Sequence, residues 1–146
     1  MNPTIKNIIA VVAGVLAGGI LNSALVNIGP SIIPLPEGAD VSSMEAIRDS
    51  IHLFGFANFI PPFLGHALGT LLGAFLAVKL AASHHKAFAL GIGVFFLLGG
   101  ITAVSMIGGP LWFNASDLIL AYIPMGWLGY RLAGSPKTAP DASGNA

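Results

Sequence analysis

Residues 58–79, NFIPPFLGHALGTLLGAFLAVK, decide the fold of this chain. The 20 residues of the run 59–78 carry no formal charge, and a helix of that length, at about 1.5 Å per residue, crosses the hydrocarbon core of a bilayer. Within it Gly65, Gly69 and Gly73 recur at every fourth position, so one side of the helix lets a neighbouring backbone come close. The stretch therefore predicts a transmembrane helix with a face for tight helix packing.

The composition excludes an ordinary soluble domain. The chain has 146 residues, of which 55% are hydrophobic and 8% charged, whereas soluble domains carry about 25% charged residues. Cysteine is absent and the net charge is zero, which excludes thiol chemistry and leaves no basic surface for nucleic acid. The adjacent His84 and His85 have no further ligands nearby in sequence. We therefore expect no metal and no cofactor, and the lipid bilayer as the main partner.

Three further apolar runs predict three further helices. The four predicted spans are 8–28, 59–79, 87–107 and 111–131. The first span repeats the small-residue pattern at Gly14 and Gly18. We expect a single domain, 1–133, folded as an all-α, up-down antiparallel bundle of four transmembrane helices. The small, polar tail 134–146 is expected to be disordered.

The one long connection, 29–57, predicts a surface element. It opens with prolines from Pro30 onward, which favour an extended path. Ser42 to Glu45 matches a capping box, and the apolar residues that follow share one side of a short helix over 43–54. Two interpretations stay open: a lid or docking element on the membrane surface, or a tethered loop that packs its apolar side onto the bundle.

The fourth span carries aromatic residues and an internal proline. Its amphipathic aromatics lie near both ends, as in an interfacial belt: Trp112, Tyr122, Trp127 and Tyr130. Pro124 has no backbone N–H to donate, so we expect a kink there.

Basic residues predict the orientation. Five of the six fall on one side of the predicted bundle, Lys6, Lys79, Lys86, Arg131 and Lys137, and the loop on the other side holds Arg48. Because cytoplasmic loops are enriched in lysine and arginine, we expect a multi-pass protein of the inner cell membrane with both termini cytoplasmic.

Four polar side chains are expected at one depth in the bundle. Asn22, His66, Thr102 and Asp117 each lie about five to seven residues inside the outer end of their span, or about 8–10 Å. Ionisable groups at such a depth are costly and are candidates for function. A carboxylate beside His66 would fix the tautomer of the imidazole and let the pair exchange a proton.

Simpler interpretations of these residues remain open. His66 is then a buried histidine that hydrogen-bonds to a neighbouring helix, with help from Thr70. Asp117 is then in the first turn of a helix capped by Asn114, where the helix dipole favours negative charge. Asn22 and Thr102 are then ordinary hydrogen-bonding residues between helices.

Three segments resemble a group of small, uncharacterised four-span bacterial inner-membrane proteins: 34–38 (PLPEG), 66–70 (HALGT) and 118–124 (LILAYIP). The resemblance covers residues 1 to about 133. It implies the four-span topology and brings no activity with it.

Two functions fit the sequence. The first is a packing protein, either self-associating or an accessory subunit of a larger membrane complex, that uses its glycine faces as contact surfaces. The second is a small proton-linked transporter or channel that uses the layer containing His66 and Asp117. No nucleophile and base stand at a recognisable spacing, so we do not expect an enzyme.

Overall fold

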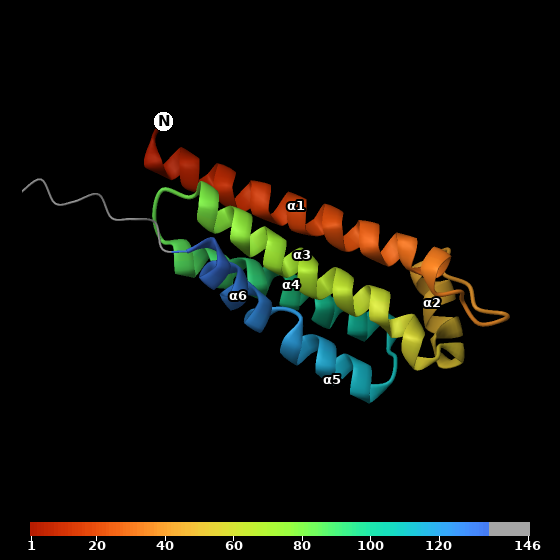
Figure 1. Ribbon diagram of the computed structural model, residues 1–146. Helices are drawn as coiled ribbons and strands as arrows, with labels where there is room; N and C mark the ends of the chain where they lie inside the picture. Colours follow the sequence, from red (N-terminus) through yellow and green to blue (C-terminus); the bar gives the residue numbers. More distant parts are fainter. Residues whose placement is uncertain (135–146) are drawn as a thin grey trace, which may run out of the picture.

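The computed structural model describes residues 1–134, whose regular elements are all helical (Figure 1). They are α1 (Pro3–Ile32), α2 (Met44–Ser50), the 3-10 turns η1 (Ile51–Leu53) and η2 (Phe56–Phe59), α3 (Ile60–Leu80), α4 (His85–Ile107), α5 (Leu111–Leu120) and α6 (Ile123–Ala133). Three segments, α1, η2 with α3, and α4, are long and apolar enough to cross a membrane. The predicted all-α class is confirmed, and these three helices indicate a membrane protein. Apart from Gly134, the tail predicted to be disordered lies outside the described residues.

Helix α3 is the central helix of the fold. Figure 1 shows it between α1 on one side and α4 and α6 on the other. It packs closely on these helices because small residues lie at the contacts. Ala74 and Ala77 are fully buried among side chains of α4 and α6, while its glycines lie against α1.

The five glycines predicted as packing positions meet inside the chain. A Cβ atom on Gly14 would lie 2.5 Å from the carbonyl oxygen of Gly73, and one on Gly18 would lie 2.5 Å from that of Gly69. Gly65 lies in the same way against Asn22. Residues later in α1 face residues earlier in α3. The two helices therefore run in opposite directions, and their backbones touch.

The outward faces of the helices are apolar. On α1, the exposed residues Ile8, Val12, Leu16 and Ile20 follow one another at four-residue intervals. Soluble monomers rarely expose continuous apolar surface on this scale. A lipid environment accounts for it, because lipid tails are as apolar as these side chains.

Helix α1 is longer than its sequence predicts. It continues through Pro30 to Ile32, although the connection was expected to start at Gly29. A proline deprives the helix of one hydrogen bond, and in the last turn that loss is not enough to end it. At the other end, the Asn7 side chain binds the α3–α4 link, since its Oδ1 accepts from the N–H groups of Ala82 and Ser83 at 2.8 and 3.3 Å.

The connection between α1 and α3 contains the predicted short helix in two pieces, α2 and η1. Its cap is Ser43, whose Oγ accepts from the N–H of Ala46 at 3.1 Å, so the N-cap lies one residue later than the predicted capping box. In the loop before it, Asp40 accepts from the N–H of Ser42 at 2.8 Å, and this hydrogen bond lowers the pKa of Asp40.

Candidate functional site

A buried histidine–carboxylate pair joins α3 to α5. His66 Nδ1 and Asp117 Oδ1 are 2.8 Å apart, and the Asp117 side chain is 2% exposed. Helix α5 begins at Leu111 with Pro110 as its N-cap, so Asp117 lies in the second turn and faces the interior. The alternative helix start with an Asn114 cap does not occur, because the Asn114 amide donates to the Gly109 carbonyl instead.

Tyr122 completes this cluster. Its hydroxyl donates to Asp117 Oδ2 at 2.8 Å, and its ring stacks on the His66 ring with centroids 5.8 Å apart. Each carboxylate oxygen of Asp117 thus has one hydrogen-bond partner, which stabilises a charge that burial alone would penalise. Gly100 of α4 makes room, since any Cβ there would collide with the Tyr122 ring. We call His66, Asp117 and Tyr122 the carboxylate cluster.

The cluster sits at a break in the predicted fourth span. Helix α5 ends at Leu120, α6 starts at Ile123, and Tyr122 between them has φ −119° and ψ −80°. Pro124 lies in the first turn of α6 and cannot donate to the Leu120 carbonyl, so one continuous helix is interrupted there. The sequence predicted a kink at Pro124, and the structure has two separate helices instead (Figure 1).

Asn22 of α1 borders the carboxylate cluster without binding to it. Its Oδ1 is buried and has no hydrogen-bond partner within the described residues. An unpaired buried acceptor costs about 1–3 kcal/mol. It is therefore a position where a bound molecule that donates a hydrogen bond would be stabilised.

Two cavities meet at these side chains. The smaller, about 230 Å³, lies between α1 and α4 and reaches Asn22, His66, Thr70 and Tyr122. The larger, about 440 Å³, extends from Asn22, His66 and Asp117 to the apolar side of α2. The apolar face of α2 forms the roof of the larger cavity, so the α2 segment both packs on the bundle and covers the carboxylate cluster.

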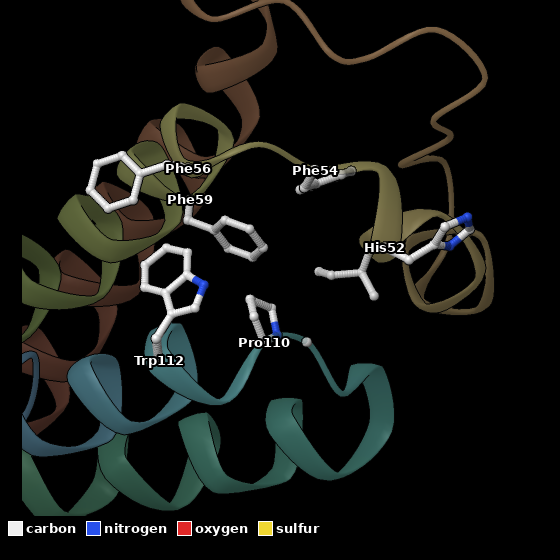
Figure 2. A pocket seen from close by; sticks show the side chains of 8 residues that line it. His52, Phe54, Phe56, Phe59, Pro110 and Trp112 are labelled. Atoms are coloured by element: carbon white, nitrogen blue, oxygen red, sulfur yellow. The ribbon is translucent and has the colours of Figure 1, made fainter.

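A third cavity, about 530 Å³, lies at the α2 end of the helices between η1, η2 and the start of α5 (Figure 2). Aromatic side chains form one wall: the Phe56 and Trp112 rings stack with centroids 5.2 Å apart, and Phe59 meets Trp112 at 5.3 Å. Among the described residues that line it, His52 is the one ionisable side chain and none is acidic. These contacts hold the start of α5 against the start of α3.

The structure brings three of the four predicted polar residues together. Asn22, His66 and Asp117 all line the larger cavity. Thr102 does not join them, because it is exposed on α4 and donates to the Leu98 carbonyl of its own helix. Tyr122 was assigned to the interfacial belt, yet it is 2% exposed and belongs to the carboxylate cluster.

Within residues 1–134, no three histidine or acidic side chains are grouped as metal ligands. His84 and His85 lie in the α3–α4 link, where His84 pairs with Ser83 at 2.8 Å. No protein-family model, curated protein or solved structure matches the chain.

Proposed function

We propose that this protein spans the inner membrane four times, with crossings formed by α1, α3, α4 and the α5–α6 pair. End to end, α5 and α6 reach about 30 Å, which matches the hydrocarbon core. The basic ends of the helices support one orientation. Lys6 and Lys86 lie near the starts of α1 and α4, and Lys79 and Arg131 lie near the ends of α3 and α6. Figure 1 shows these four helix ends opposite α2. Both termini are then cytoplasmic, the bundle is up-down and antiparallel, and α2 lies outside.

Within this topology we propose a small proton-linked transporter whose central site is the carboxylate cluster. The observation that carries the proposal is Asp117, a carboxylate 2% exposed and hydrogen-bonded to His66 and Tyr122 at the inner end of a cavity. Intramembrane ionisable groups that pair with each other mark ion and substrate pathways. We assign no catalysed reaction to the protein.

The helix break supports a transport role. Discontinuous helices with irregular backbone at a cavity are typical of transporter binding sites. Here the break at Tyr122 contributes a side chain to the carboxylate cluster. On its cytoplasmic side, Ala74, Ala77, Val78 and Ile92 form a packed core. The cavity thus lies on the α2 side of the carboxylate cluster, under the α2 roof, and the bundle is packed toward the termini.

Replacing either proton-exchanging partner is expected to stop proton transfer without unfolding the protein. Asp117→Asn and His66→Gln keep hydrogen-bonding capacity and remove the two groups proposed to exchange a proton. In liposomes with a trapped pH-sensitive dye, wild type should take up protons after an external acid step. Both variants should fall to the rate of protein-free vesicles, while Thr102→Val, an exposed polar position, keeps the wild-type rate. Two variants with unchanged rates would end this proposal.

A packing role is the second candidate function, and one observation favours it. The five predicted glycines are used between α1 and α3, but Gly91 and Gly99 of α4 have no atom within 4 Å of a Cβ position. If this face binds a second copy or a larger membrane complex, Gly91→Leu should lower the mass of the assembly in mild detergent. An unchanged mass would indicate that this face of α4 contacts lipid and not a second protein.

A further inference from the structure

We propose that the larger cavity binds a neutral, single-chain amphiphile whose polar end donates hydrogen bonds to Asn22 and His66. The proposal rests on the proposed function for its site and adds the chemical class of the solute. The cavity has two chemically distinct ends, and each limits what fits.

The polar end offers acceptors that lack donors. With Asp117 ionised, His66 donates from Nδ1, and a neutral ring then presents Nε2 as an acceptor. Among residues 1–134 neither Nε2 nor the buried Asn22 Oδ1 receives a hydrogen bond. Asp117 already accepts from His66 and Tyr122. A hydroxyl or amide N–H group on a ligand would supply the missing donor.

The rest of the cavity wall is mostly apolar and includes Val26, Met44, Ile47, Val104 and Ile107. Ser23 also lines it, and the Asn27, Asn58 and Asn114 amides in the wall donate to backbone carbonyls. At about 440 Å³ it has roughly three times the volume of the ~150 Å³ cavity that holds one benzene molecule, and it falls within the ~300–1,000 Å³ typical of small-ligand sites. This space suits one medium-length chain with a compact head.

The charges argue against an anionic head. No lysine or arginine is found among the described residues that line this cavity. Asp117 at its inner end would repel a carboxylate or phosphate. Proton transfer gives a release step, because protonation of His66 Nε2 turns that acceptor into a donor. The titratable groups that face His66 are Asp117 and Tyr122, and α4 contributes only Phe96, Gly99, Gly100 and Ala103 to the neighbouring cavity.

The test is photolabelling of the full chain in nanodiscs with a diazirine analogue of octanol and with its methyl ether. The two probes share the chain, and the ether cannot donate a hydrogen bond. At neutral pH the alcohol should label peptides that contain Met44 or Val104, and excess octanol should compete. Labelling by the ether at these peptides should be about tenfold lower, the loss expected for one missing hydrogen bond to a buried acceptor. Asn22→Leu removes one of the two acceptors and should lower the alcohol signal, and Thr102→Val should leave it unchanged.

Equal labelling by the two probes, or labelling confined to the outward residues of α1 and α4, would overturn the assignment of the ligand. This comparison uses the wild-type protein and does not depend on the folding of a variant. It also separates the two proposals. Competed octanol labelling with proton uptake unaffected by Asp117→Asn would retain the ligand class and reject proton-linked transport. Proton uptake that needs Asp117, without octanol labelling, would do the reverse.

Discussion

Gly18→Leu is expected to lower the stability of the protein by about 3 kcal/mol, the upper end of the usual cost of overpacking. The added Cβ would lie 2.5 Å from the Gly69 carbonyl oxygen and 3.1 Å from the Phe96 ring. The nearest atom belongs to the backbone of α3, which cannot move aside as a side chain can. Helix α1 would have to separate from α3 along its length. Thermal unfolding in mild detergent, followed by circular dichroism, measures the change.

Gly19→Leu is the matched control. It lies one residue further along the same helix, and a Cβ there has no atom within 4 Å. We expect its stability to stay within about 0.5 kcal/mol of wild type. Equal destabilisation by the two variants would mean that helix propensity or insertion, and not the contact with Gly69, controls stability at this end of α1.

The glycine pattern predicted close packing but could not predict the partner. The spacing of Gly65, Gly69 and Gly73 says only that a backbone can approach. Either a second copy or another helix of the same chain satisfies it. The structure pairs Gly69 with Gly18 and Gly73 with Gly14, so these glycines pack α1 against α3 within one chain.

The rotation of each helix about its axis was the second limit on prediction. Helix α4 is apolar on all sides, so its sequence does not indicate which face turns inward. Counting residues placed Thr102 at the depth of the other polar residues, and the helix rotates it outward. Asp117 and His66 were easier to predict, since Asp117 is the one carboxylate and His66 the one histidine within the predicted spans 111–131 and 59–79.

The break in the fourth span shows why Tyr122 was missed. A proline within a predicted helix is compatible with a kink or with an interruption, and the choice depends on the surrounding contacts. Here the Tyr122 hydroxyl binds Asp117 and its ring stacks on His66. Its position along the span predicted that Tyr122 lies at the membrane interface, because the sequence does not show its contacts with Asp117 and His66.

The hydrogen bond between His66 and Asp117 should appear as coupling in a double-mutant cycle. His66→Leu leaves the buried Asp117 carboxylate with Tyr122 as its remaining partner, and loss of one member of a buried charged pair costs about 3–5 kcal/mol. Asp117→Leu leaves the His66 N–H and the Tyr122 hydroxyl unpaired, at about 1–3 kcal/mol each. The double variant removes both members of the pair, so its destabilisation should be smaller than the sum of the single losses by about 2 kcal/mol.

If the losses of stability in the two single variants simply add, the 2.8 Å contact between His66 and Asp117 does not stabilise the protein. The size of the coupling also bears on function. A fold that keeps its stability when both groups become leucine does not need a charge at this depth for packing. Replacing charged core groups with apolar ones is often neutral or stabilising. If the double variant is as stable as wild type and no longer takes up protons, the His66–Asp117 pair is present for proton transfer and not for the fold.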